Sequence, residues 1–517
     1  MENDLKEELN RRMRTAWAAF AAVREATDQL TDQYLRAHLF DSTLLPALCY
    51  AAETLPANLF YGKMIPDQVD TSFTSPQKCV TNGTCSYSEK VATKTFRPQV
   101  EVHLKKGIAK SQVEGKLSEL ETLIKTQRNI RNWIPIVVES TDAASEDSKS
   151  LTELIQGIIV GCMNFPDAYH LDDILDTIAL CEQNVHFYKL YCDGAMSQSL
   201  SVDENSDETA MGSLLWELPC TEFENLWENL IYDSDLKNEL MSYAHALIHL
   251  SDKGADMKVI NVNRLIILLG PPGTGKTTLC RGVAQHLSIR LNSRFSSSVM
   301  VEINSHSLFS KWFSESGKLV LKMFDQIDEM AEDGKCLVFV LIDEVESLGM
   351  SRDASTSRGD PADSIRAVNA LLTQIDRIRR LDHFGRSNVI VLCTSNLEDC
   401  LDRALLDRAD VVKHVGQPSA TALYSILARC IEELTRIKVV TTEERIPHVR
   451  ELKDNAAMYP AGCELMELAR LAQGLSGRSI RQVPALAWSK SDGDAVSLNN
   501  CLLLFREAIL EKAERCK

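Results

Sequence analysis

The sequence predicts an α/β fold: a parallel sheet between helices, preceded by a small α+β domain and followed by an α-helical C-terminal lid. Four continuous apolar or β-branched runs, separated by helical stretches, are typical of strands buried on both faces of a parallel sheet. These runs are residues 265–269, 299–303, 337–342 and 389–394. After Pro418 the apolar spacing is helical to the end of the chain, which predicts the lid over 418–517. The sheet and its helices are therefore expected over 213–417.

The segment before the sheet, residues 96–212, is expected to form the small α+β domain. Apolar and polar residues alternate over 99–104, which predicts a strand with one buried face. Strand-like runs follow at 134–138 and 185–190. The segment closes in an acidic, serine-rich stretch, 197–212, that is typical of a loop. Thr221 and Glu224 then form a capping-box pattern, which predicts the start of an amphipathic helix.

Composition restricts the classes of function. The chain has 517 residues, of which 44% are apolar and 25% charged, and its net charge is −17. Nucleic-acid binding relies on basic side chains that neutralise the negative phosphates. Because this chain is acidic, we expect no direct binding to nucleic acid. The apolar runs are far shorter than the roughly 20 residues that cross a bilayer, and the acidic N-terminus is unlike a secretory signal, so no membrane association is expected. Fifteen cysteines without a C-x-x-C pair indicate buried thiols in a reducing compartment.

A phosphate-binding motif lies between the run 265–269 and a predicted helix. It has the pattern G-x-x-x-x-G-K-[ST] and consists of Gly270, Pro271, Pro272, Gly273, Thr274, Gly275, Lys276 and Thr277. The glycines allow backbone N–H groups to turn toward phosphate oxygens at a helix N-terminus. We expect Lys276 to reach the β- and γ-phosphates of ATP and the Thr277 hydroxyl to bind Mg²⁺.

Two later strands end in polar residues that suit the same chemistry. Asp343 and Glu344 follow the run 337–342, and Asn396 follows the run 389–394. Because parallel strands end at one edge of a sheet, these side chains are expected near the phosphates. Asp343 would hold Mg²⁺, Glu344 would polarise the attacking water, and Asn396 would contact both the γ-phosphate and that water. The alternatives are that the acidic pair caps a helix and that Asn396 is a turn residue.

With these motifs the sequence resembles the AAA+ ATPases, and more narrowly the pachytene checkpoint protein 2 family of HORMA-domain remodellers. The resemblance extends from residue 96 to the C-terminus and is most specific in 302–318, 341–348 and 407–410. It implies a P-loop NTPase core of the AAA+ type and hydrolysis of ATP with Mg²⁺. It also implies a ring-shaped homohexamer with its ATP sites between neighbouring subunits.

The resemblance assigns roles to further residues. Arg408 matches the arginine finger that reaches the γ-phosphate of the next subunit, and Arg403, which also follows an aspartate, is the alternative. Arg478 matches the sensor arginine at the start of a lid helix, which contacts the γ-phosphate. Trp312 and Phe313 match the pore loop that grips a polypeptide in the central channel. From residue type alone, the arginines could instead be surface ion-pair partners and the aromatic residues part of the core.

The resemblance also implies substrates and a place of action. Residues 96–212 would recognise a HORMA-domain protein, directly or through a HORMA adaptor, and ATP hydrolysis would partly unfold it from its closed to its open form. The implied processes are disassembly of spindle-checkpoint complexes, remodelling of meiotic chromosome axes and the meiotic recombination checkpoint. They place the protein in the nucleus and cytoplasm, at chromosomes and kinetochores.

Two other functions stay open from the residues. One is a different AAA enzyme, for example a microtubule-severing or membrane-trafficking one, and the other is a nucleotide-binding scaffold without turnover. Residues 1–60 depart from the family. They resemble the tail of a non-LTR retrotransposon reverse transcriptase, without its polymerase carboxylates, in 11–20, 35–42 and 44–54. We therefore expect 1–95 to be an atypical extension and not a functional module.

Overall fold

The computed structural model describes most of the chain from Pro98 to Arg515. Outside the description lie residues 1–97, 128–129, 131, 138–150, 152, 163–170, 172–179, 182–183, 202–208, 257–258, 261, 305–315, 348–361, 382–387, 398–400, 443, 492–494 and 516–517. The retrotransposon-like segment and both predicted pore-loop aromatics, Trp312 and Phe313, are among them. In the part of the chain that the structure describes, no helix combines the length and hydrophobicity needed to cross a bilayer.

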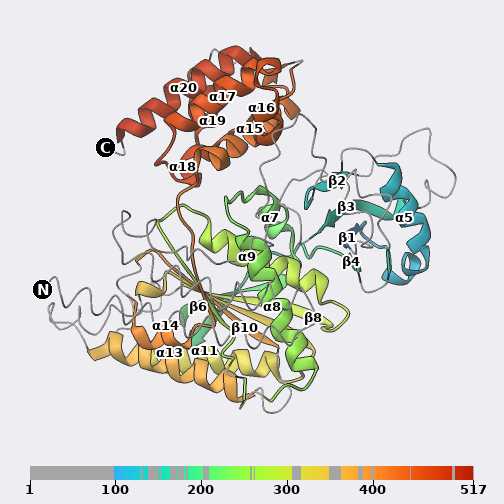
Figure 1. Cartoon of the computed structure of the whole chain (residues 1–517). Helices are drawn as coiled ribbons and strands as arrows, with labels where there is room; N and C mark the ends of the chain where they lie inside the picture. Colours follow the sequence, from blue (N-terminus) through green and yellow to red (C-terminus); the bar gives the residue numbers. More distant parts are fainter. Residues whose placement is uncertain are drawn as a thin grey trace, which may run out of the picture. The chain divides into compact units, whose positions relative to one another are not determined.

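The first described region is a four-stranded sheet with its own apolar core (Figure 1). Its strand order is β2-β3-β1-β4, with β1 antiparallel to β3 and parallel to β4. The elements are β1 (Gln99–Leu104), the short 3-10 helices η3 (Lys110–Gln112) and η4 (Glu114–Lys116), α5 (Leu117–Thr126), β2 (Pro135–Val137), β3 (Ile155–Gly161) and β4 (Val185–Tyr188). The three predicted strands are confirmed. The predicted single buried face of β1 is wrong, because Glu101 and His103 on its polar face are also buried.

The second region is a seven-stranded sheet with strand order β11-β7-β10-β9-β8-β6-β5. Its elements are β5 (Met196–Ser201), β6 (Thr209–Leu218), η6 (Thr221–Phe223), α7 (Leu226–Asn229), α8 (Leu236–Asp252), β7 (Leu265–Leu269), α9 (Lys276–Arg290), β8 (Ser297–Asn304), α11 (Ser316–Ala331), β9 (Cys336–Asp343), η7 (Val345–Ser347), α13 (Ala362–Leu381), β10 (Val389–Ser395), α14 (Arg403–Arg408) and β11 (Val411–His414). Strands β8, β9, β10 and β7 are parallel, as the four apolar runs predict. The unpredicted edge strand β11 pairs parallel with β7.

Helices cover both faces of this sheet, so alternate strand residues enter two different cores. In β9, Val338 and Val340 pack with α11 and α13, whereas Phe339 and Leu341 pack with α8 and α9. Figure 1 shows the two sets of helices on opposite sides of the strands. This two-sided burial is the physical reason that the strands appear in the sequence as continuous apolar runs.

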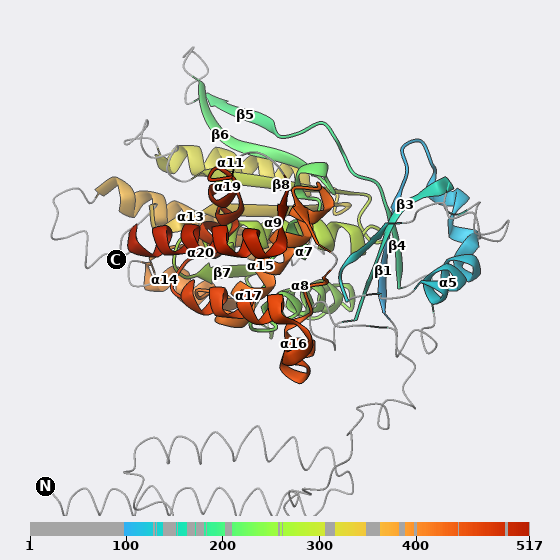
Figure 2. The same ribbon diagram turned by 90° about the horizontal axis from the view of Figure 1, so that it is seen from above.

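Three predictions for residues 197–230 are wrong. The serine-rich stretch 197–212 is not a loop where it is described, because β5 and β6 pair antiparallel and β6 pairs antiparallel with β8 (Figure 2). The predicted boundary between residues 212 and 213 lies within β6. The capping-box pattern at Thr221 does not begin a continuous helix. Asn225 has a left-handed φ of 58°, which separates η6 from α7 and allows Phe223 and Trp227 both to reach the core.

The third region is the helical lid predicted after Pro418. It consists of α15 (Ala420–Arg436), β12 (Val440–Thr441), α16 (Val449–Asp454), η10 (Ala456–Met458), α17 (Pro460–Leu471), α18 (Gly477–Arg481), α19 (Val483–Trp488), β13 (Val496–Ser497) and α20 (Leu498–Arg515). Its helices enclose a separate apolar core, and β12 and β13 form a short parallel pair that joins two of its connections. The lid begins directly after the chain leaves β11 beside the phosphate-binding motif.

Candidate ATP-hydrolysis site

The phosphate-binding loop joins the end of β7 to the start of α9, as the motif predicts. Gly270 has a φ of 140°, and a Cβ atom at this position would lie 2.2 Å from the carbonyl oxygen of Val415. Gly275 has a φ of 94°, and a Cβ there would lie 2.8 Å from Cδ2 of Leu230. Both glycines therefore combine a left-handed backbone with a close approach to another segment. The loop can take this shape only with glycine at these positions.

Lys276 is buried at the first position of α9. Its Nζ donates to the carbonyl oxygens of Gly270 at 2.7 Å and Pro271 at 2.9 Å, and to Oδ1 of Asn396 at 2.8 Å. Burial lowers the pKa of Lys276 below its usual value, although the carboxylates of Glu346, Asp343 and Glu344 oppose this shift. The ammonium group thus lies at the meeting point of the loop and the end of β10.

The acidic pair lies at the end of β9, beside Thr277. The Thr277 hydroxyl donates to Oδ1 of Asp343 at 2.7 Å, and the Thr394 hydroxyl donates to the same oxygen. Glu344 has a left-handed φ of 54°, its N–H donates to Oγ1 of Thr394 at 3.2 Å, and its side chain is exposed. Asp343 is therefore fixed by two hydroxyl groups, whereas the side chain of Glu344 is solvent-exposed at the same edge of the sheet.

Asn396 follows β10 and contacts both the phosphate-binding loop and the segment that follows β9. Its Oδ1 accepts the bond from Lys276, and its N–H donates to Oε1 of Glu346 at 3.0 Å. The structure thus brings together the residues that the sequence places at the ends of β7, β9 and β10. Neither Thr394 nor Glu346 was predicted. Glu346 lies two residues after Glu344, which is the only signal in the sequence that points to it.

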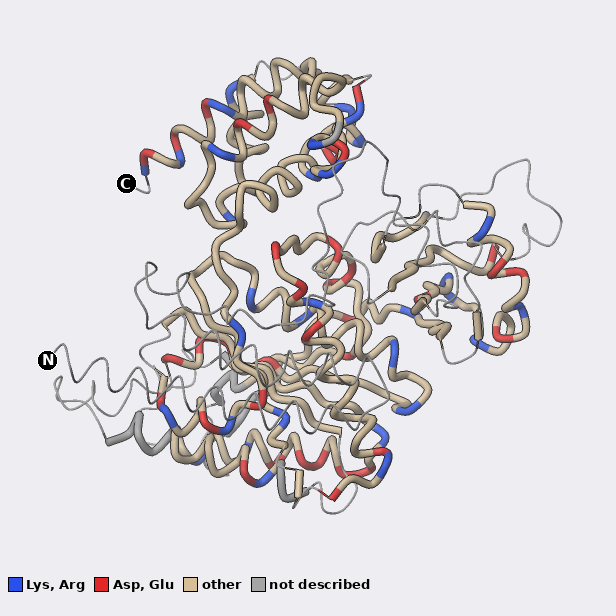
Figure 3. Tube along the Cα trace, in the orientation of Figure 1, with Lys and Arg blue, Asp and Glu red and all other residues tan. Residues whose placement is uncertain are grey.

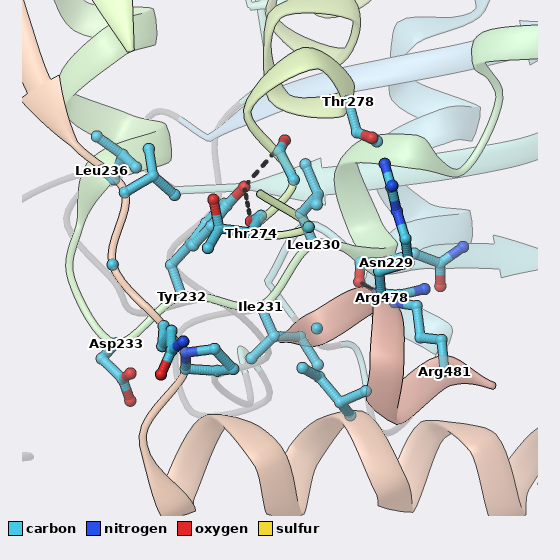
Figure 4. Close-up of a pocket in the computed structure, with 18 of the residues that line it drawn as sticks. Asn229, Leu230, Ile231, Tyr232, Asp233, Leu236, Thr274, Thr278, Arg478 and Arg481 are labelled. Atoms are coloured by element: carbon cyan, nitrogen blue, oxygen red, sulfur yellow. Dashed lines mark hydrogen bonds between the residues drawn. The ribbon is translucent and has the colours of Figure 1, made fainter. Parts of the chain in front are cut away.

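A cavity of about 600 Å³ opens beside the loop. Its lining combines Gly273, Thr274 and Gly275 with segment 226–236, segment 414–418 and the start of α18. Figure 4 shows Asp233 and Leu236 on one side of this cavity and Arg478 and Arg481 on the other. The Tyr232 hydroxyl donates to the carbonyl oxygens of Thr274 at 3.5 Å and Gly275 at 3.4 Å. Apolar walls beside a phosphate loop suit a purine base, and no local motif in the sequence marks these residues.

Arg478 lies where the lid meets the phosphate loop. Its backbone N–H donates to the carbonyl oxygen of Gly273 at 3.2 Å, and its exposed side chain lines the cavity. The neighbouring Arg481 donates from Nη2 to the carbonyl oxygen of Asn229. The N-terminus of α18 is capped by the Ser476 hydroxyl, which accepts from the N–H of Ser479 at 3.2 Å. The predicted sensor arginine is thus held on a short, capped helix beside the loop.

The two candidate finger residues lie at opposite ends of α14. Arg403 is the first residue of α14 and is exposed, with no ion pair among the described residues. Arg408 is the last residue and forms two 2.9 Å hydrogen bonds to Asp376, which raise its pKa above the usual value. The end of α14 is fixed further by Asp410, whose carboxylate accepts from the backbone N–H of Asn263 at 2.9 Å. Of the two, Arg408 is the one that an ion pair among the described residues holds in place.

Thr277 and Asp343 fit a Mg²⁺ site, because a hydroxyl and a carboxylate oxygen lie together at the phosphate loop and hard oxygen ligands suit this ion. Few protein ligands are expected, since Mg²⁺ at such sites keeps waters and takes phosphate oxygens.

Comparison with known proteins agrees with this geometry. The Pch2 N-terminal domain family matches residues 94–190, the family "ATPase family associated with various cellular activities (AAA)" matches 266–417, and the TRIP13-like AAA+ ATPase lid C-terminal domain matches 419–513. Pachytene checkpoint protein 2 of Caenorhabditis elegans is 54% identical over 419 residues, which are 80% of this chain and 96% of that protein. The mouse homolog is 44% identical over 316 residues, 60% of this chain and 71% of that protein. The solved structure of C. elegans PCH-2 has a TM-score of 0.67 at 50% identity and covers 81% of this chain and 100% of that one.

A mostly parallel sheet with a phosphate loop, an acidic strand end and a helical lid defines an ATP-hydrolysing enzyme of the AAA class. Within that class, the chain belongs to the pachytene checkpoint protein 2 family. The predicted fold, family and enzyme class are confirmed. The roles of individual site residues, the hexamer and the retrotransposon resemblance are not tested by these comparisons and stay predictions.

Proposed function

We propose that the chain is the subunit of a homohexameric, ATP-driven remodeller that partly unfolds HORMA-domain proteins and converts their closed form to the open form. The observation that carries the proposal is an assembled nucleotide site flanked by an N-terminal domain and a lid of the Pch2 and TRIP13 types. An ATPase core alone would support many functions, whereas these flanking domains indicate one family of remodellers.

Each residue at the site has a defined task in this proposal. Lys276 and the loop N–H groups bind the phosphates, and Thr277 and Asp343 hold Mg²⁺. The ion, when bound, neutralises charge on the β- and γ-phosphate oxygens. Glu344 takes the proton of the attacking water, and its exposed position at the end of β9 leaves room for that water. Asn396, already bonded to Lys276, orients the γ-phosphate side of the site.

Two arginines complete the site and link it to motion. Arg408 stabilises the transferring phosphate of the neighbouring subunit. Arginine fingers of this kind raise the rate of hydrolysis by roughly 10³- to 10⁵-fold. Arg478 couples the position of the lid to the bound nucleotide, because its backbone N–H donates to the carbonyl oxygen of Gly273 in the phosphate loop at 3.2 Å. The resulting motion is carried to Trp312 and Phe313, which grip the substrate chain.

The N-terminal sheet region is proposed to dock the HORMA-domain substrate or its adaptor. Its match to the Pch2 N-terminal domain supports this role. The biological setting follows from relatives that are named pachytene checkpoint proteins. We propose meiotic chromosome-axis remodelling, the recombination checkpoint and disassembly of spindle-checkpoint complexes, in the nucleus and cytoplasm and at kinetochores.

Glu344→Gln tests this function directly. The variant keeps the shape of the side chain and the bonds of Asp343 and Thr277, so ATP binding is expected to persist while hydrolysis stops. A pull-down with this variant in ATP and Mg²⁺ should retain a HORMA-domain protein. Trp312→Ala serves as the matched variant and is expected to bind ATP but to leave a closed HORMA domain unconverted. Retention of tubulin or membrane proteins instead, or unchanged conversion by Trp312→Ala, would contradict the proposal.

A further inference from the structure

Arg408 is held in a single orientation by its ion pair with Asp376 of α13. Nε and Nη2 of the guanidinium each donate to a different carboxylate oxygen of Asp376 at 2.9 Å. Nη1 donates to the carbonyl oxygen of Ala404, one turn earlier in α14, at 3.0 Å. A planar group bonded twice to one carboxylate cannot rotate without breaking both bonds. The pair is partly accessible, with 30% of the Arg408 side chain and 35% of the Asp376 side chain exposed.

This arrangement leaves donors of Arg408 available for a phosphate. A guanidinium has five N–H groups. The three bonds found in the described part of the chain use one on Nε, one on Nη2 and one on Nη1. The described residues thus leave one donor on each Nη nitrogen, and these two nitrogens form the end of the planar fork that matches two phosphate oxygens. Asp376 therefore fixes Arg408 without occupying all the donors that a phosphate needs.

The turn of α13 that carries Asp376 is itself anchored. The next residue, Arg377, contacts α11 through Nη1 to Oδ1 of Asp325 and through Nη2 to Oδ2 of Asp328, each at 2.6 Å. On the opposite side of the same turn, Ile375 is fully buried in the core shared by α11 and α13. Figure 3 shows residues of both charge signs along these two helices. Asp376 thus projects from a helix that packing and ion pairs hold in place.

We propose that Asp376 is a positioning residue that presents the guanidinium of Arg408 to the γ-phosphate bound by the neighbouring subunit. The inference rests on the proposed function, because it takes Arg408 as a finger that acts across the subunit boundary. It accounts for the fixed side chain of Arg408 at the last position of α14, whereas Arg403 at the first position has no ion pair among the described residues. No sequence motif marks Asp376, which lies 32 residues before its partner.

Asp376→Asn in the full-length protein is the first test. The amide keeps the size of the side chain but offers only one acceptor oxygen, and its NH₂ group opposes a guanidinium donor. A finger displaced by about an ångström should lower kcat by roughly 10- to 100-fold. The KM for ATP should stay unchanged, because the residues that bind ATP within the subunit are not altered. Asp376→Glu, which restores the negative charge, should recover part of kcat.

A matched control is available elsewhere in the same sheet region. Asp252 of α8 accepts from Nε of Arg294 at 2.9 Å, and the two side chains are 37% and 39% exposed. Asp252→Asn therefore removes a comparable surface ion pair and should leave kcat as in the wild type. The double variant Asp376→Asn/Arg408→Ala should be no slower than Arg408→Ala alone, because Asp376 acts only through Arg408.

Mixed assemblies separate this inference from the proposed function. Lys276→Ala subunits cannot use their own ATP but present an intact Arg408. Mixing them with Asp376→Asn subunits should restore hydrolysis at seams where an intact finger faces an intact ATP site. If Arg408→Ala is not restored by the same mixing, the finger role itself fails. Two outcomes would overturn the positioning role of Asp376 while the finger role of Arg408 stands. In one, mixing restores hydrolysis by Arg408→Ala but not by Asp376→Asn. In the other, Asp376→Asn has the kcat of the wild type without any mixing.

Discussion

At the scale of single residues, the phosphate loop makes a sharp prediction for Gly270→Ala. The new methyl group would meet the carbonyl oxygen of Val415 at 2.2 Å on a backbone with a φ of 140°. We expect the free energy of unfolding to fall by about 1–3 kcal/mol and ATP binding to be lost with it. Thermal unfolding and titration with a fluorescent ATP analogue measure the two effects.

The control is Gly317→Ala in α11. A Cβ atom there would have no described atom within 4 Å, and alanine favours a helix over glycine, so stability should be unchanged or slightly higher. Normal ATP affinity of Gly270→Ala would show that the loop is not the phosphate site.

Residue-scale prediction from the sequence succeeds only where a motif lies at a strand end. Lys276 follows β7 across the loop, Asp343 is the last residue of β9, and Asn396 follows β10. Parallel strands deliver their ends to one edge, so the meeting of these residues could be expected. Thr394 and Tyr232 reach the same site through contacts between segments far apart in the chain, and neither stands in a recognisable pattern. A polar residue inside an apolar strand, as Thr394 is in β10, is the one weak signal that was available.

At the scale of elements, α9 carries charge at both ends. Its first residue, Lys276, lies in the phosphate loop, and its last turns reach a buried carboxylate of β1. His286 Nδ1 lies 2.7 Å from Oε2 of Glu101, and Arg290 Nε lies 2.8 Å from Oε1. Nε2 of His286 also lies 3.5 Å from Oε1 of Glu228 in α7, and Trp133 stacks on the guanidinium of Arg290. The helix that follows the phosphate-binding motif is therefore joined to the N-terminal sheet by a buried charge cluster.

This cluster predicts how stability depends on pH. Burial raises the pKa of Glu101, but His286 and Arg290 overcome this effect and lower it from 4.5 to about 2. Burial lowers the pKa of His286, but Glu101 and Glu228 overcome this effect and raise it from 6.5 to about 9. The stabilisation from Glu101 is present above pH 4.5 and is lost toward pH 2. That from His286 is present below pH 6.5 and is lost toward pH 9.

Glu101→Gln should therefore lower the unfolding midpoint most between pH 4.5 and 6.5, and less near pH 9. Loss of one partner from a buried ion pair costs about 3–5 kcal/mol, so the effect should be large at pH 6. Thermal unfolding of the wild type and the variant across this range measures the difference. Glu121→Gln, which removes a surface pair with Lys125 at 2.7 Å, should have little effect at any pH. A difference between wild type and Glu101→Gln that grows toward pH 9 would contradict the charge assignment.

At the scale of the whole molecule, the sequence predicts the layers better than their edges. The central parallel strands bury both faces, so their apolar runs are visible in the sequence. The edge strands cannot be recognised as apolar runs in the sequence, because β11 is half-exposed along its length and β5 is rich in serine. Their pairing is determined by the neighbouring strand and not by their own composition. The predicted loop over 197–212 fails for this reason.

Residues 1–90 precede the first described residue, Pro98. Every described residue assigned to the site lies between Leu226 and Gln482, and the matching domain families begin at residue 94. Deletion of 1–90 is therefore expected to leave both the ATPase rate and the proposed hexamer unchanged. The rate is measured by phosphate release and the assembly by size-exclusion chromatography with ATP. The Pch2 N-terminal match is retained in this deletion, so conversion of a HORMA-domain substrate should also persist. Loss of the hexamer, with the ATP site intact, would instead make this extension part of the subunit interface.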